Sequence, residues 1–270
     1  VPAQTTRRVL LPESVLNGMK DLGRAPHLLP SVACGGKLPS MGDFVWSTPD
    51  PELRGPLDAW LQTGMHQFRL AYVDQWQAMF DNAPLWNFIV PAGGLSKDCI
   101  IGCLSPSCDR VGRRFPFVVA FPLPSRVAPW QMTSVVNSTP VLLSRVGLLL
   151  FNCIRRRWPM ETLVSLIQQS FVDWHTSQSN AHGHLDIETG DSDILTVLMD
   201  GSIDNDKAAT LPNDRFASLP WSDVASNLCP PTAMSFWWTN GAGNASLKAF
   251  TYSAHPDGTL LAWLFGRPSN

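Results

Sequence analysis

Three short apolar runs in the middle of the chain constrain its fold more than any other feature. They read LWNFIV (Leu85–Val90), CIIGCL (Cys99–Leu104) and FPFVVAF (Phe115–Phe121). The connections between them, PAGGLSKD and SPSCDRVGRR, are short and rich in turn-forming residues. Short connections favour hairpins, because a parallel crossover needs about a dozen residues or more. The runs therefore predict antiparallel neighbours in one sheet, with Pro116 at a strand start, an edge or a bulge.

Helical periodicity flanks these strands on both sides. Apolar residues recur every three or four positions and predict one helix over 56–82, with Pro56 in its first turn. Two further helices are predicted over Pro140–Trp158 and Met160–Trp174. The helix over 56–82 has a wide apolar face, which must pack against a sheet.

The carboxyl-terminal part returns to strand-like patterns. AMSFWWTNG (Ala233–Gly241) is apolar and aromatic and then breaks at glycine and asparagine. SLKAFTYS and TLLAWLFG flank AHPDG, a strong turn signal, so the pair 246–253 and 259–266 is interpreted as a hairpin. The whole pattern predicts an α+β fold, a mainly antiparallel sheet packed against helices in a single domain closed by carboxyl-terminal strands. A two-domain alternative would divide the chain near residue 125.

The first 31 residues are polar and without sustained period, so we interpret 1–31 as a flexible or atypical lead and 32–270 as the α+β domain. In SVACGGKLPSMGDFV (Ser31–Val45) we expect a strand that ends near Cys34 and then a tight loop. The run DILTVLMDG (Asp193–Gly201) predicts a strand or a short helix.

Composition excludes some classes of function. The net charge of −2 gives no reason to expect electrostatic capture of nucleic acid or of an acidic membrane. The longest apolar stretch is interrupted by Arg145 and is too short for a bilayer of about 30 Å, so no integral membrane segment is expected. Six cysteines in 270 residues do not make a disulfide framework, and we interpret them as reduced thiols of a cytoplasmic protein. We expect a monomer or a weak homo-oligomer.

Motifs for catalysis are weak. CGGKLPS lacks the spacing of a phosphate-binding loop, and G-x-S-x-G does not occur. His182 and His184, followed by Asp186 and Glu188, keep open the alternative of a metal-dependent hydrolase, although the segment is also typical of a polar surface loop. The spacing of Cys99 and Cys103 does not match the C-x-x-C pairs of a zinc site. Both side chains should point into the core from one face of a strand. We therefore assign no catalytic residue, metal or cofactor.

The stretch LSPSCDRVGRRFPF (Leu104–Phe117) places an aspartate and three arginines between two strands. Asp109 could pair with one of the arginines through a fork of hydrogen bonds, and Gly112 permits a tight turn. One interpretation is an ion-paired hairpin loop. The other is an exposed arginine cluster that binds a carboxylate or phosphate of a partner, and the two are compatible.

Four motifs occur in order along the chain: GKLPSMGDFV (36–45), DAWLQ (58–62), PSCDRVGRRFPF (106–117) and FWWTNG (236–241). In this order and spacing the sequence resembles the TagF/ImpM family of type VI secretion accessory proteins. The resemblance is close over about 32–125 and looser through FWWTNG. It implies a bacterial cytoplasmic protein without catalytic activity, a post-translational repressor that engages a forkhead-associated scaffold protein. A structural subunit of the secretion baseplate is the remaining alternative.

If the chain acts by binding, we expect two exposed loops to carry recognition through charge, hydrogen bonds and buried aromatic area. Other residues of the same loops should set the backbone geometry. The expected partner-binding residues are Lys37, Ser40, Asp43, Phe44, Arg110, Arg113 and Arg114, and the expected structural residues are Gly36, Gly42, Asp109 and Gly112.

Overall fold

We describe the protein from a computed structural model, and the description concerns the compact unit that spans residues 31–270. The lead over 1–31, the element expected over 193–201 and the histidines of the possible metal site lie outside the described residues. The structure describes residues 32–48, 50–123, 129–180, 216–217, 234–242, 246 and 248–266.

The described unit alternates between strands and helices along the chain. Its elements are β1 (Ala33–Lys37), β2 (Phe44–Trp46), α2 (Pro51–Ala71), α3 (Trp76–Asp81), β3 (Trp86–Val90), β4 (Cys99–Ser105), β5 (Phe117–Leu123), α4 (Pro129–Arg156), α5 (Met160–Asn180), β6 (Phe216–Ala217), β7 (Ser235–Thr239), β8 (Ala249–Tyr252) and α8 (Gly258–Gly266).

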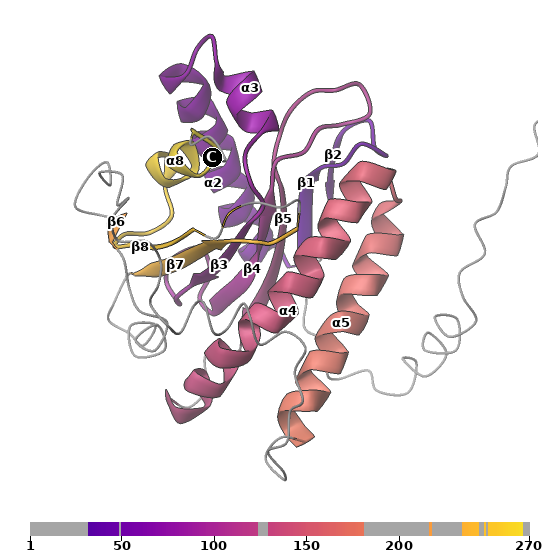
Figure 1. Ribbon diagram of the computed structural model, residues 1–270, viewed down its shortest axis with the longest axis vertical. Coiled ribbons are helices and arrows are strands. Elements are labelled where there is room, and N and C mark those ends of the chain that lie inside the picture. The colour runs from indigo at the N-terminus through magenta and orange to yellow at the C-terminus, as the bar shows by residue number, and fades with distance from the viewer. Residues whose placement is uncertain are drawn as a thin grey trace, which may run out of the picture. The chain divides into compact units, whose positions relative to one another are not determined.

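One eight-stranded sheet runs through the unit in the order β2-β1-β5-β4-β3-β7-β8-β6 (Figure 1). Every neighbouring pair is antiparallel. The three apolar runs of the sequence are its central strands β3, β4 and β5, with Gly102 opposite both Phe88 and Ala120. The predicted α+β class with a mainly antiparallel sheet is confirmed, and β7 and β8 extend the sheet beyond β3.

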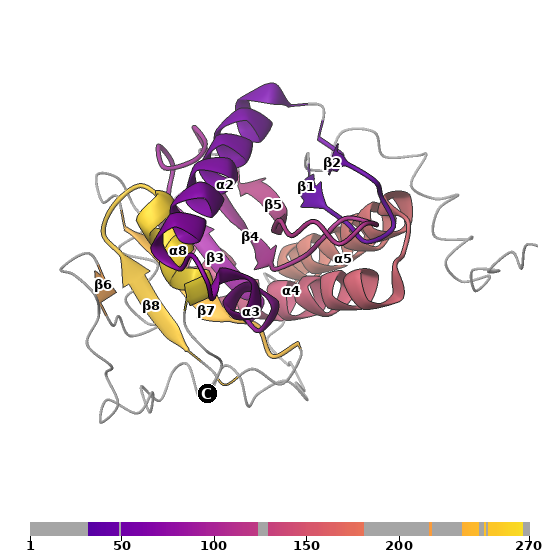
Figure 2. The same ribbon diagram turned by 90° about the horizontal axis from the view of Figure 1, so that it is seen from above.

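Helices cover both faces of the sheet, with α4 and α5 on one face and α2, α3 and α8 on the other (Figure 2). Side chains along β4 alternate between the two cores. Ile101 and Cys103 belong to the core shared with α4 and α5, whereas Ile100 and Leu104 belong to the core shared with α2 and α8. Because both faces are buried, the central strands are continuously apolar, and this made them stand out in the sequence.

The helix predicted over 56–82 is two helices, and this prediction was wrong in its continuity and its start. α2 begins at Pro51, where the Asp50 side chain accepts a hydrogen bond from the backbone N–H of Glu52 (2.9 Å). α2 ends at Ala71, and the chain turns before α3 begins at Trp76. The apolar spacing continues across this turn because both helices pack into the same core, so periodicity alone does not reveal the break.

The predicted carboxyl-terminal hairpin is also wrong, because residues 258–266 form the helix α8. Asp257 begins the helix by accepting hydrogen bonds at Oδ1 from the Leu260 backbone N–H (3.0 Å) and from the Tyr252 hydroxyl (2.9 Å). Leu261 and Phe265, like most residues of α8, are buried. A short helix that is apolar on nearly all sides has no helical period in its sequence and therefore resembles a buried strand.

Two boundaries differ from the sequence expectation in smaller ways. β1 does not end near Cys34 but continues to Lys37, through Gly36 at a φ of 127°. α4 begins at Pro129 instead of Pro140, since a proline inside a helix removes one backbone hydrogen bond without ending it. Among the described residues, no helix is long and apolar enough to cross a membrane.

Candidate functional site

The loop between β4 and β5 is built around the carboxylate of Asp109, which is only 1% exposed. Its Oδ1 accepts hydrogen bonds from the backbone N–H groups of Val111 (3.1 Å) and Arg113 (2.9 Å). Its Oδ2 accepts from Lys37 Nζ (3.0 Å) and from Arg113 Nε (2.6 Å). Gly112, at a φ of 89°, turns the chain between these donors. The loop is therefore held by hydrogen bonds and ion pairs to a single side chain.

These contacts determine the protonation of Asp109. Burial alone would raise the pKa of its carboxyl group, but the hydrogen bonds from Lys37 and Arg113 outweigh burial and hold the pKa well below its ordinary value. The carboxylate is thus ionised at neutral pH. Because its oxygens already accept hydrogen bonds from four donors, we assign Asp109 to the geometry of the loop.

The loop between β1 and β2 lies against this β4–β5 loop. The backbone N–H of Arg110 donates to the carbonyl oxygen of Met41 (2.7 Å), and Arg113 Nη2 donates to the carbonyl oxygen of Gly42 (2.7 Å). The two loops that the sequence analysis treated as separate regions therefore form one continuous surface.

Lys37 departs from the expectation of an exposed loop residue, because it is 6% exposed. Its ammonium group is neutralised by Asp109, which lies 72 positions further along the chain. Arg114 is half-buried, and the fork-shaped pair expected at Asp109 is formed instead between Arg114 and Asp81. The Nε and Nη2 atoms of Arg114 donate to the two oxygens of Asp81 (2.7 and 2.6 Å). Among the other expected partner-binding residues, Ser40 is half-buried, whereas Asp43, Phe44, Arg110 and Arg113 are exposed.

A residue that the sequence analysis missed, Arg69 of α2, connects this surface to the helices. Its Nη2 donates to the carbonyl oxygen of Arg114 (3.2 Å), and its guanidinium group lies 4.7 Å from the ring centre of Trp76 on α3. The β4–β5 loop is thus attached to α2 by Arg69 and to the end of α3 by the pair of Arg114 and Asp81.

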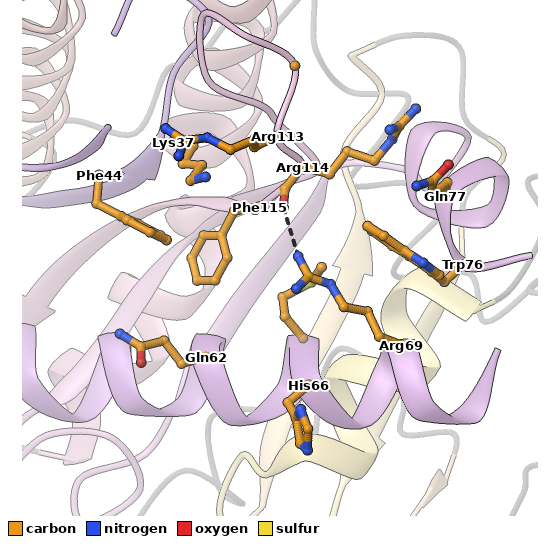
Figure 3. A pocket seen from close by; sticks show the side chains of 12 residues that line it. Lys37, Phe44, Gln62, His66, Arg69, Trp76, Gln77, Arg113, Arg114 and Phe115 are labelled. Atoms are coloured by element: carbon orange, nitrogen blue, oxygen red, sulfur yellow. Dashed lines mark hydrogen bonds between the residues drawn. The ribbon is translucent and has the colours of Figure 1, made fainter. Parts of the chain in front are cut away.

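Between these attachments lies a hollow of about 660 Å³ (Figure 3). Phe44 and Phe115 meet edge to face on one side, with ring centres 4.8 Å apart, and Lys37 Nζ lies 4.8 Å from the Phe44 ring centre. In Figure 3 the side chain of Arg69 extends from α2 to the backbone carbonyl of Arg114, where a dashed line marks their hydrogen bond. The residues that line the hollow are Lys37, Phe44, Gln62, Met65, His66, Arg69, Trp76, Gln77, Gly112, Arg113, Arg114 and Phe115.

The hollow brings together four of the expected partner-binding residues, Lys37, Phe44, Arg113 and Arg114, with residues of α2 and α3. Gln62, Met65 and Arg69 recur at a spacing of three and four on one side of α2. Met65 belongs to the buried stripe of the helix, and Gln62 and Arg69 are exposed beside it. This spacing was visible in the sequence. Their position opposite the β4–β5 loop was not, because it depends on how α2 crosses the sheet.

The thiols of the described cysteines are poor candidates for chemistry. Cys99 and Cys103 lie in the core on one face of β4, as predicted. Burial raises the pKa of Cys34 and of Cys153 to about 12, and it raises the pKa of Cys103 as well. Such thiols remain protonated at neutral pH and are weak nucleophiles. Among the described residues, no three histidine, cysteine, aspartate or glutamate side chains are placed to hold a metal ion.

Comparison with known proteins identifies the family. A family profile described as TagF N-terminal domain, Type VI secretion system-associated, matches residues 33–170, slightly more than half of the chain. The chain belongs to the TagF family. The match contains β1 to β5, α2, α3 and all the residues that line the hollow. The resemblance given by the four sequence motifs is thereby confirmed, and the chain is an accessory protein of type VI secretion.

A solved structure has a similar fold over most of the chain. The crystal structure of PA0076 from Pseudomonas aeruginosa PAO1 is similar, with a TM-score of 0.57 and 25% sequence identity. The alignment covers 89% of this chain and 96% of PA0076, so the likeness extends beyond residue 170. A search of the curated proteins found no match.

Proposed function

We propose that this TagF-family protein is a non-catalytic, post-translational repressor of type VI secretion. It acts in the cytoplasm by binding a component of the apparatus, and a forkhead-associated scaffold protein is the expected partner. Repression of this kind requires only that the protein bind the inactive state of its partner more tightly than the active state. It requires no bond to be made or broken.

One observation carries the proposal: the buried Asp109 fixes a loop whose Arg113 side chain is exposed and lines the same hollow as the exposed ring of Phe44 on β2. Asp109 orders the loop before any partner arrives, so binding does not have to supply that ordering free energy. Phe44 is 45% exposed, and the Arg113 side chain is 59% exposed. Aromatic and arginine side chains on a rigid support are typical anchors of protein interfaces.

Deletion of the gene tests the direction of the effect. Without a repressor, the amount of secreted effector in the culture supernatant should rise, and overproduction of the protein should lower it. If the protein were a structural subunit of the baseplate, deletion would abolish secretion. Unchanged secretion after both manipulations would reject a regulatory role.

Affinity purification from the native bacterium tests the partner. The tagged protein should retain a forkhead-associated scaffold protein, identified by mass spectrometry. Charge reversal at the exposed Arg110 should reduce the recovery of this partner, since its side chain faces solvent beside Gly42. Charge reversal at Arg156 on α4 is the matched control, because it is equally an exposed arginine but lies outside the surface. Equal recovery with both variants would contradict the proposed surface.

The rival hydrolase makes a different prediction. Purified protein would contain stoichiometric zinc or manganese, and phosphatase or esterase turnover would fall in a His184→Ala variant. We expect neither bound metal at that stoichiometry nor turnover that depends on His184.

A further inference from the structure

The charges that line the hollow are not balanced. Lys37 and Arg113 share the single carboxylate of Asp109, which leaves one positive charge in excess. Arg114 is fully paired with Asp81 and adds none. Arg69 makes no ion pair with any described residue and adds a second positive charge. None of the described residues that line the hollow is acidic, so the hollow favours an anionic ligand.

The free hydrogen-bonding capacity lies with Arg69 and Arg113. Arg69 uses only Nη2, in its bond to the carbonyl of Arg114, and its other N–H groups make no hydrogen bond to the described residues. Arg113 uses Nε and Nη2 and retains Nη1. The planar fork of a guanidinium group binds a carboxylate with geometric specificity. When neighbours hold the guanidinium group in place, less side-chain entropy is lost on binding.

The apolar lining selects among anionic ligands. Phe44 and Phe115 form an edge-to-face pair at one side of the hollow, and Trp76 lies at the other. Phe44 has 45% of its surface exposed, so an apolar side chain that covered it would gain burial on binding. The ligand should therefore carry carboxylates next to an apolar side chain.

Carboxylates outside the hollow argue against a continuous polyanion. Asp43 is exposed beside Phe44, and Asp58 accepts a hydrogen bond from the Gln62 side chain (2.9 Å), one helical turn from the hollow. These two carboxylates would repel a nucleic-acid backbone that ran past the hollow. A short acidic peptide segment does not meet this repulsion.

We propose that the hollow binds a short acidic segment of the partner protein, with carboxylates at Arg69 and Arg113 and an apolar side chain on Phe44. This deepens the proposed function by giving the chemistry of the partner segment. The proposal rests on the proposed function only for the existence of a partner, because the peptide-binding property can be measured without one.

A random peptide library displayed on phage tests the proposal on the full chain. The library is selected on the wild-type protein and counter-selected on an Arg69→Glu variant. We expect the enriched peptides to have at least two aspartate or glutamate residues beside an aromatic or aliphatic residue. Enriched peptides without an acidic excess would overturn the proposal. Absence of enrichment over the counter-selected variant, or competition by a single-stranded oligonucleotide, would overturn it as well.

One enriched peptide, labelled with fluorescein, then serves as the probe for fluorescence anisotropy. The Arg69→Glu change should weaken binding about tenfold or more, since a charge-assisted contact is lost. Phe44→Ala should weaken it without changing its salt dependence, whereas the control Arg156→Glu should leave the affinity unchanged. A version of the probe with glutamine and asparagine for its acidic residues should bind at least about tenfold more weakly. Equal affinities for the two probes would reject the carboxylate site.

The two proposals fail separately. Peptide binding with wild-type secretion after gene deletion would reject the repressor function and leave the acidic-peptide site standing. A deletion phenotype without selective peptide binding would do the reverse.

Discussion

Replacement of Asp109 by asparagine removes the only negative charge from a cluster of three charged groups, of which Asp109 and Lys37 are buried. The asparagine side chain retains an oxygen that can accept from the backbone N–H groups of Val111 and Arg113. Arg113 is 59% exposed on its side chain and is solvated, so the loss of its ion pair should cost no more than about 1 kcal/mol. The main cost therefore falls on Lys37, whose side chain is 8% exposed.

An ammonium group that is buried without its counter-ion destabilises a protein by about 3–5 kcal/mol. In a chain of this size, we expect the Asp109→Asn variant to unfold about 6–20 °C below the wild type. Urea denaturation monitored by tryptophan fluorescence measures the free energy of unfolding directly. The double variant Lys37→Met with Asp109→Asn removes both buried charges and should regain most of the loss, with a coupling free energy of about 2 kcal/mol or more.

The pH dependence of stability gives a second readout. Because the pKa of Asp109 is lower in the folded chain than in the unfolded chain, its contribution to stability is complete above about pH 5. The contribution decreases as the pH falls below the ordinary aspartate pKa of about 4. The wild type should therefore lose more stability than the Asp109→Asn variant between about pH 5 and pH 2. The buried ion pair would be refuted if Asp109→Asn alone lowered the free energy of unfolding by less than about 1 kcal/mol. Parallel pH profiles of stability for the wild type and this variant would refute it as well.

Three further predictions concern the scaffold. Gly36→Ala should lower the free energy of unfolding by more than about 2 kcal/mol, because Gly36 has a φ of 127° and a Cβ there would collide with the Pro116 carbonyl. The control Gly55→Ala in α2, with open space around it, should raise the free energy of unfolding by about 0.5–1 kcal/mol. Asp257→Ala should lower the free energy of unfolding by about 1 kcal/mol, because it removes the cap of α8. Asp257→Asn keeps an acceptor and should lower it less. Equal losses for the two variants in urea titrations would contradict the capping role. Cys34, whose pKa is raised to about 12 by burial, should react with Ellman's reagent at pH 8 only after unfolding, and rapid native-state labelling would disprove its burial.

The sequence was sufficient for the centre of the fold. β3, β4 and β5 were predicted almost to their ends, because both of their faces are buried and their connections are short and rich in turn-forming residues. Segments whose conformation depends on distant residues were not predicted. The run 259–266 is a helix because Asp257 caps it and two helices cover it, and nothing within the run distinguishes that outcome from a strand.

The candidate site was predicted only in part, for the same reason. The composition of the β4–β5 loop indicated that Asp109 would pair with an arginine, but not that Lys37 would occupy a buried position beside it. Arg69 was missed because its significance depends on α2 lying opposite the loop. Local turn chemistry is encoded in neighbouring residues, whereas a surface shared by segments far apart in the sequence requires the tertiary arrangement.

Docking through the hollow is tested by the amount of effector secreted by a deletion strain that carries a plasmid-borne Arg69→Glu, Phe44→Ala double variant. We expect secretion close to that of the deletion strain, with the variant protein present at the wild-type level on an immunoblot and with a wild-type unfolding midpoint. The Arg156→Glu variant should repress secretion as the wild type does. Full repression by the double variant would contradict the claim that this hollow is the docking surface through which the protein acts.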